Sequence, residues 1–131
     1  MKSLKLVMAL AAVLIVAGCD MNTAPSGFVE VTVDQVQAQL ESNNIPKLIL
    51  DVRSEGEYAS GHVPTAKNIS VDTLASRLNE VPKDVDVYVY CESGKRSTRA
   101  AEMLTEAGYD KVHNMRASMR GWRAANYPIE K

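Results

Sequence analysis

Two short apolar runs constrain the fold of this chain more than any other feature: KLILDV at residues 47–52 and VDVYVYC at residues 85–91. Both runs are short and nearly continuous, which is typical of strands buried on both faces. Segments with a helical spacing of apolar residues lie between and beyond them. Strands that alternate with helices predict an α/β fold, in which a mainly parallel sheet is flanked by helices.

The expected helices carry start and stop signals. Thr32 with Gln35, and Ser54 with Glu57, have the spacing of a capping box. Gly108 is well placed to end a helix. These patterns predict helices over residues 32–43, 54–58, 70–81, 97–108 and 118–127, and short strands over 66–70 and 111–115. Residues 70–81 are expected to form one helix, with Ser70 as its cap and with Val71, Leu74, Leu78 and Val81 facing inward.

The first 18 residues have the layout of a secretory signal. Lys2 and Lys5 precede an apolar run at residues 6–17, which ends in small residues. A membrane-spanning anchor is the alternative, but a helix needs about 20 apolar residues to cross the hydrocarbon. Residues 1–18 are therefore expected to be removed on export.

The end of this run, VAGC at residues 16–19, resembles the lipobox of bacterial lipoproteins. The resemblance implies cleavage before Cys19 and acylation of that residue, which anchors the chain to a membrane. Asp20 resembles the signal that retains such lipoproteins at the inner membrane, on its periplasmic side, within the cell envelope. Residues 19–27 are then a lipidated cysteine and tether, and residues 28–131 the folded domain. An ordinary cleaved signal, in which Cys19 is incidental, is the alternative.

The composition gives no sign of several classes of partner and site. The chain is 46% hydrophobic and 24% charged, and its net charge of −1 gives no reason to expect a nucleic-acid partner. With Cys19 lipidated, Cys91 has no partner for a disulfide within the chain. No metal-ligand spacing is visible, and no cofactor is expected. No feature of the sequence requires an oligomer, so a monomer is expected.

Cys91 is the last residue of the second apolar run and opens the polar stretch CESGKRS. Ligands of parallel α/β sheets bind at the carboxyl ends of the strands, where this thiol is expected to lie. A thiol reacts as the thiolate, which a loop of backbone N–H groups and a following helix N-terminus both stabilise. Lys95 and Arg96 add positive charge, so the negative side chain of Glu92 should point away from the sulfur. The alternative is an inert cysteine that closes a buried strand.

Four segments together resemble rhodanese-domain proteins, the sulfurtransferases. They are CESGKRS, the strand VYVYC, residues 48–70 with their Asp-Val-Arg, Glu-Tyr, Gly-His and Asn-Ile pairs, and GWRAANYPI at residues 121–129. The resemblance covers residues 29–129. It implies a three-layer rhodanese-like fold with a mainly parallel sheet of about five strands, and no metal or organic cofactor.

The resemblance also implies a reaction and its residues. Cys91 takes the outer sulfur of thiosulfate or a similar small anion as a persulfide and passes it to a thiol or cyanide. Asp51 and Arg53 are supporting residues. The residues implied to bind the persulfide and substrate are Glu92, Ser93, Gly94, Lys95, Arg96 and Ser97. One departure is visible: Ala117 and Ser118 stand where the family usually carries two glycines, so the local path there is expected to differ.

Two rival functions share the cysteine. A related phosphatase or arsenate reductase needs Cys-x5-Arg to grip an oxyanion, but that position holds Ser97, and Arg96 comes one residue too soon. A non-catalytic persulfide carrier or sensor at the membrane could have the same loop. Structural roles are expected for two other residues. His62 should stabilise an exposed-looking turn through a hydrogen bond, and Trp122 should pack in the core. The arginines that follow the last strand either guide anions or form a solvated basic face: Arg116, Arg120 and Arg123.

Overall fold

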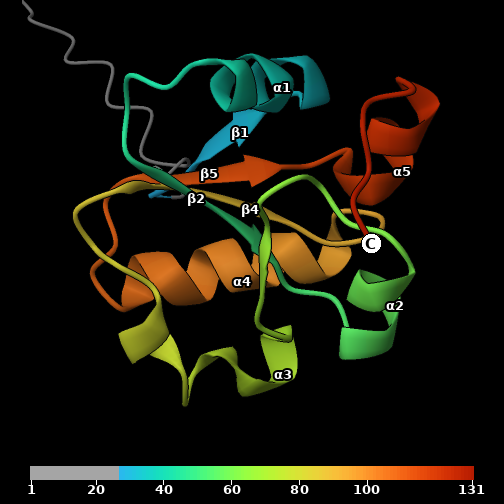
Figure 1. Ribbon diagram of the computed structural model, residues 1–131. Coiled ribbons are helices and arrows are strands. Elements are labelled where there is room, and N and C mark those ends of the chain that lie inside the picture. Colours follow the sequence, from blue (N-terminus) through green and yellow to red (C-terminus); the bar gives the residue numbers. More distant parts are fainter. Residues whose placement is uncertain (1–26) are drawn as a thin grey trace, which may run out of the picture.

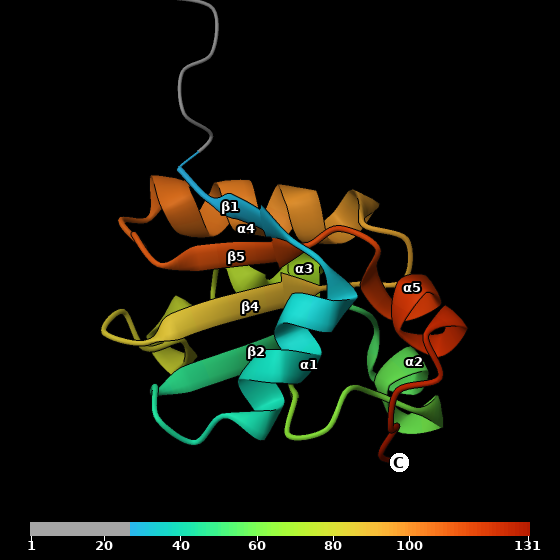
Figure 2. The same ribbon diagram turned by 90° about the horizontal axis from the view of Figure 1, so that it is seen from above.

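The computed structural model describes residues 27–131, which form a three-layer α/β domain (Figure 1). Five parallel strands make one sheet in the order β1-β5-β4-β2-β3. The strands are β1 Val29–Val31, β2 Lys47–Asp51, β3 Lys67–Asn68, β4 Asp86–Tyr90 and β5 Val112–Met115. The α/β fold class expected from the sequence is confirmed. β4 lies in the middle of the sheet, so its carboxyl end is enclosed by neighbours on both sides (Figure 2).

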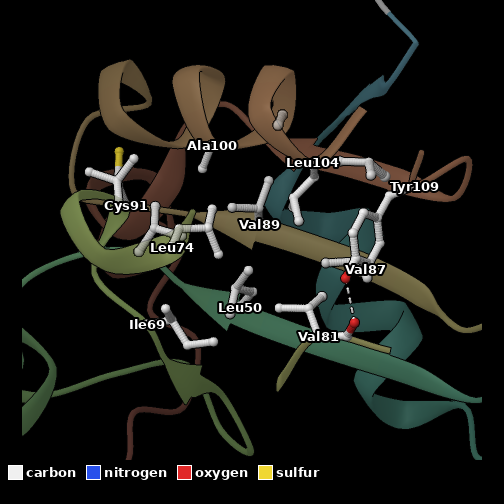
Figure 3. Packing of buried hydrophobic residues seen from close by; sticks show 14 residues of the cluster. Leu50, Ile69, Leu74, Val81, Val87, Val89, Cys91, Ala100, Leu104 and Tyr109 are labelled. Carbon is white, nitrogen blue, oxygen red and sulfur yellow. Dashed lines mark hydrogen bonds between the residues drawn. The ribbon is translucent and has the colours of Figure 1, made fainter. Parts of the chain in front are cut away.

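Alternating side chains of the central strands build two separate cores. Leu50, Val87 and Val89 pack on the face covered by α4 Lys95–Glu106, in a cluster that includes Cys91 (Figure 3). Tyr88 and Tyr90 face the opposite side, in a cluster with residues of α1 Val33–Glu41 and α5 Ser118–Ala124. Both faces of the strands are therefore apolar, which explains why their sequences read as nearly continuous runs.

The helix starts follow the capping signals. Thr32 caps α1 and Ser54 caps α2 Glu55–Ser60, each in a complete capping box with the residue three positions later. Gly108, at φ 92°, follows α4 in the left-handed conformation that often ends a helix. α4 begins at Lys95, two residues earlier than the sequence pattern indicates, so its first turn includes the two basic residues of the cysteine loop.

The single helix expected over residues 70–81 is wrong. Ser70 does cap a helix, but α3 spans only Val71–Leu74, and a separate 3₁₀ turn covers Leu78–Glu80. A helix continued to this point would bond the Leu78 carbonyl to the N–H four residues on, but residue 82 is proline and has none. That carbonyl instead accepts from Val81 N at 3.0 Å and lies 2.8 Å from the Tyr109 hydroxyl. The apolar spacing survives because the turns still deliver Leu74 and Val81 to the core.

The expectations for the amino-terminal segment lie outside the described residues. They comprise the signal at 1–18, the lipidated Cys19 and the tether up to residue 26. None of the helices within residues 27–131 has the length and hydropathy needed to cross a membrane.

Candidate active site

Cys91 directly follows β4, at the carboxyl edge of the sheet, and the next turn leads into α4. Gly94 makes this turn possible with a φ of 97°, a left-handed conformation that favours glycine. A Cβ at this position would lie 2.2 Å from the carbonyl oxygen of Arg116, so the chain after β5 presses directly on the loop. The loop and the segment before α5 therefore define one another's path around the cysteine.

The sulfur of Cys91 is fully buried, yet polar donors surround it. The Gly94 N–H donates to Sγ at 3.1 Å. Burial alone would raise the pKa of the thiol, but the amide and hydroxyl of Ser97, the Gly94 amide and the Ser118 hydroxyl together hold that pKa below its usual value. The geometry thus favours the ionised sulfur, as a nucleophile requires.

The carbonyl groups of Cys91 and Glu92 are hydrogen-bonded to α5. The Cys91 and Glu92 carbonyls accept from the backbone N–H groups of Met119 and Arg120, at 3.0 and 3.1 Å. The first turn of α5 therefore satisfies two acceptors that would otherwise compete with the sulfur for the loop's donors. Amides therefore face the sulfur, and the first two carbonyls after β4 face α5.

Ser118 belongs to the site, and sequence reasoning did not place it there. Its Oγ accepts from the Cys91 N–H at 3.1 Å, donates to the Met115 carbonyl at 2.9 Å and lies 3.8 Å from Cys91 Sγ. Ala117 keeps ordinary helical angles, whereas Ser118 has a φ of 54°, which costs a non-glycine residue about 1–2 kcal/mol. The departure from the family's two glycines therefore affects one residue, and that residue's side chain contacts the nucleophile. The glycine mismatch was the available signal.

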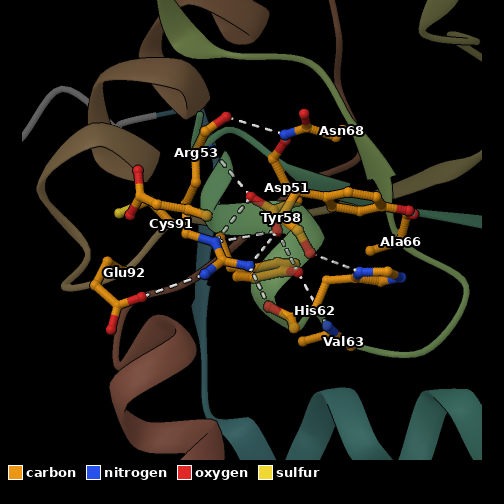
Figure 4. Close-up of polar contacts among 12 residues, drawn as sticks. Asp51, Arg53, Tyr58, His62, Val63, Ala66, Asn68, Cys91 and Glu92 are labelled. Carbon is orange, nitrogen blue, oxygen red and sulfur yellow. Dashed lines mark hydrogen bonds and ion pairs between the residues drawn. The ribbon is translucent and has the colours of Figure 1, made fainter. Parts of the chain in front are cut away.

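Asp51 and Arg53 form a buried ion pair beside the loop (Figure 4). Arg53 Nη2 lies 2.8 Å from Asp51 Oδ2, and the Tyr90 hydroxyl donates to the same oxygen at 2.6 Å. Burial and the Asp51 charge both raise the pKa of the Tyr90 hydroxyl, so it stays protonated as a donor. Arg53 also donates to the Gly61 carbonyl at 2.7 Å. The pair ties the end of β2 to the turn after α2. Its supporting role in the reaction stays a prediction.

Three ion pairs lie beside the loop. Arg96 holds Glu57 through two contacts of 2.7 and 2.9 Å, and this hydrogen-bonded guanidinium lowers the pKa of Glu57 to about 2. Glu92 turns its carboxylate to Arg123 and, at 3.4 Å, to Arg53 Nη1 (Figure 4). The negative charge of Glu92 is therefore paired with two arginines, in line with the expectation that it avoids the sulfur.

The remaining loop residues differ in exposure. Ser97 is buried and its hydroxyl donates to the Gly94 carbonyl at 3.1 Å, whereas Ser93 and Lys95 are exposed. Arg116 and Arg120 are exposed as well, on the segment after β5. Their substrate-binding roles stay predictions.

His62 is buried, with 7% of its surface exposed, which corrects the expectation of an exposed turn. Its ring stacks on Tyr58 at 3.7 Å, and its Nδ1 lies 3.0 Å from the Tyr58 carbonyl (Figure 4). This is the turn-stabilising role predicted for it. Trp122 is fully buried and donates to the Pro128 carbonyl at 2.8 Å, as expected of a core residue. Across residues 27–131, no group of three or more potential ligand side chains could hold a metal ion.

Comparison with known families now adds to this geometry. The family model described as the rhodanese-like domain matches residues 32–125, which includes the whole site. The chain belongs to the rhodanese-like domain family.

Two relatives of this rhodanese-like domain carry names that describe activities. A protein named sulfurtransferase from Allochromatium vinosum is 38% identical over 82 residues, which cover 63% of this chain and 77% of the relative. The thiosulfate sulfurtransferase GlpE of Tolumonas auensis is 31% identical over 99 residues, covering 75% of this chain and 91% of the relative.

Among solved structures, the crystal structure of a rhodanese-like domain protein from Staphylococcus aureus matches with a TM-score of 0.67 and 34% identity. The match covers 72% of this chain and 90% of that one. The three-layer rhodanese-like fold expected from the resemblance is therefore confirmed.

Proposed function

We propose that the protein is a sulfurtransferase that carries sulfane sulfur on Cys91. The observation that carries this proposal is a buried sulfur at the carboxyl end of the central strand that accepts the Gly94 N–H, with its pKa lowered by loop amides. Membership of the rhodanese-like family and the names of the sulfurtransferase relatives support the same conclusion.

The reaction has two balanced steps. The Cys91 thiolate attacks the outer sulfur of thiosulfate, the bond between the two donor sulfurs breaks, and its electron pair leaves with sulfite. The persulfide that results carries one negative charge, which the Gly94 and Ser97 amides stabilise as an oxyanion hole would. Cyanide, or a thiolate in the cell, then attacks the outer sulfur, and the Cys91 thiolate departs. This is nucleophilic catalysis and predicts ping-pong kinetics.

The structure also bears on the phosphatase alternative. A phosphatase of this type needs an arginine that grips an oxyanion with both terminal nitrogens. The nearest arginine, Arg96, uses two of its nitrogens to hold Glu57. The residue at the required position, Ser97, is buried and bonds within the loop. Both observations favour transfer of sulfur over transfer of phosphate.

Mass spectrometry of the protein after incubation with thiosulfate tests the proposal. We expect the tryptic peptide of residues 84–95 to gain the mass of one sulfur atom, and cyanide to remove it with release of thiocyanate. Cys91→Ser should gain no sulfur and form no thiocyanate. Thiocyanate formation at the normal rate by this variant would exclude Cys91 as the nucleophile.

Turnover separates the enzyme from the alternative of a persulfide carrier or sensor. An enzyme forms many equivalents of thiocyanate per Cys91, whereas a carrier loads and discharges one equivalent at the rate at which its partner supplies it. Multiple turnovers with thiosulfate and cyanide alone are therefore expected.

We further propose that Cys19 is lipidated and that the domain acts as a monomer on the periplasmic side of the inner membrane. The support is the VAGC motif and Asp20, which follow an apolar run. Protein extracted from native membranes should begin at Cys19 and weigh more than its peptide mass by acyl groups. An unmodified mass would remove the anchor from the proposal.

A further inference from the structure

Ser118 combines three properties that rarely occur together. It is fully buried, it has a left-handed φ of 54°, and its hydroxyl lies 3.8 Å from the sulfur of Cys91. A serine resists this backbone conformation and a glycine does not. The strained backbone indicates a functional role for the side chain. Its hydrogen-bond partners show what that role is.

The hydroxyl has one proton and two possible acceptors. In the described geometry it donates to the Met115 carbonyl at 2.9 Å while it accepts the Cys91 N–H at 3.1 Å. The neutral Cys91 thiol can donate its own proton to this oxygen, and an ionised sulfur can only accept. Rotation about the Cβ–Oγ bond alone moves the hydroxyl proton from Met115 toward Sγ, because no heavy atom has to shift.

We propose that the Ser118 hydroxyl donates a hydrogen bond to the ionised sulfur of Cys91 and keeps its proton, which makes Ser118 a catalytic residue of this chain. The donation joins those from the loop amides and comes from a different segment, the start of α5. It is strongest when the charge lies on Sγ itself. In the persulfide the charge lies mainly on the outer sulfur, so the Ser118 hydroxyl then turns back and donates its hydrogen bond to the Met115 carbonyl.

The position of the charge, on Sγ in the thiolate and on the outer sulfur in the persulfide, assigns Ser118 to the second step. This part of the inference rests on the proposed function. In that step the Cys91 thiolate is the leaving group, and a thiolate of lower pKa leaves faster. Loss of the hydroxyl should raise the Cys91 pKa by about one unit, as expected for one lost hydrogen bond to a charged group. Discharge to cyanide should then slow, because the leaving thiolate is more basic.

The charged groups around the sulfur are the same in wild-type and variant protein. On the β2 and α2 side they are Asp51, Arg53 and Glu57; on the loop and α4 they are Glu92, Lys95 and Arg96; around α5 they are Arg116, Arg120 and Arg123. All three of these carboxylates are paired with arginines. A change in the titration of Cys91 on replacement of Ser118 therefore reports the hydroxyl.

The test compares Ser118→Ala and Ser118→Gly with the wild-type full-length chain. Alanine removes the hydroxyl and keeps the strained backbone, whereas glycine removes the hydroxyl and relieves the strain. Iodoacetamide labelling of Cys91 is followed from pH 5 to pH 10 through the tryptic peptide of residues 84–95, which excludes any signal from Cys19. Rates of persulfide formation and of cyanide discharge are measured separately by rapid mixing.

We expect both variants to raise the labelling midpoint by about one unit, and discharge to slow more than loading. An unchanged midpoint in both variants would overturn the inference. A shift in only one of them would overturn it too, because backbone strain and not the hydroxyl would then set the titration. The labelling does not depend on sulfur transfer. A wild-type protein that never forms a persulfide, yet shows both shifts, would refute the proposed function and leave the role of Ser118 intact.

Discussion

Replacement of Gly94 by alanine tests the claim that backbone geometry at this turn creates the site. Gly94 has a φ of 97°, and an added Cβ would lie 2.2 Å from the Arg116 carbonyl oxygen. The left-handed conformation costs a non-glycine residue about 1–2 kcal/mol. Relief of the overlap requires a shift of backbone, which costs roughly another 1–3 kcal/mol, as overpacking does. The free energy of unfolding should therefore fall by about 3 kcal/mol.

Gly108→Ala is the matched control. Gly108 has a similar φ of 92°, but its added Cβ would meet only the tip of the flexible Lys83 side chain, at 3.4 Å. This variant pays the conformational cost alone, about 1–2 kcal/mol. Gly56→Ala is the neutral control, because nothing lies within 4 Å of its added Cβ. Alanine within a helix should stabilise by about 0.5–1 kcal/mol relative to glycine.

Urea unfolding followed by circular dichroism measures these differences. With an m-value near 2 kcal/mol/M, the Gly94 variant should unfold about 1 M lower in urea than the Gly108 variant. Iodoacetamide labelling should also shift to higher pH in Gly94→Ala only, because the Gly94 amide moves away from the sulfur. Equal urea midpoints for the two variants would refute the reasoning, since the contact with Arg116 would then carry no energy.

Three further predictions concern the charged groups. Arg96→Ala should lower kcat/KM for thiosulfate more than it affects persulfide lifetime, because the donor is doubly charged; equal donor kinetics would contradict this. Glu57 has its pKa lowered to about 2 from 4.5, so its ion pair stabilises the fold above about pH 4.5 and loses this effect as the pH falls toward 2. The pair is about one-third exposed, so its energy is small. In urea titrations, the free energy of unfolding of the wild type should exceed that of Glu57→Gln by under about 1 kcal/mol at pH 6, and by less at pH 3. Arg53→Met should cost about 3–5 kcal/mol, because it leaves the buried Asp51 carboxylate unpaired, whereas Arg77→Met, at an exposed pair, should change the free energy of unfolding far less; similar losses would argue against the buried pair.

The fold was accessible from the sequence because its signals are local. The runs KLILDV and VDVYVYC encode strands through their apolar composition, and the capping boxes at Thr32 and Ser54 encode helix starts through neighbouring hydrogen bonds. The helix over residues 70–81 was mispredicted for two reasons. Its apolar spacing fits a helix, but Pro82 has no N–H for the Leu78 carbonyl, which was a local signal. Tyr109, far away in sequence, also lies at the carbonyls of Leu78 and Val81 and supports a tighter turn.

The reactive cysteine and its supporting loop could be predicted, because CESGKRS places a thiol, a glycine and a helix start within seven residues. The side chains that pair with residues of the loop and of the strand before it could not be predicted. Arg96 and Glu57 are 39 residues apart, as are Tyr90 and Asp51, and no spacing rule relates them. Such pairs arise when separate strand ends converge at one edge of the sheet.

By itself, the sequence determined the alternation of strands and helices, the turn at Gly94 and the thiol at the end of a strand, because each depends on residues within a few positions of one another. Only the tertiary structure decided that the Ser118 hydroxyl meets the sulfur and that the Arg116 carbonyl closes the loop. Both contacts depend on how the chain returns after β5 to pack against the turn after β4. Packing between segments remote in sequence sets that path, and residue order alone does not encode it locally.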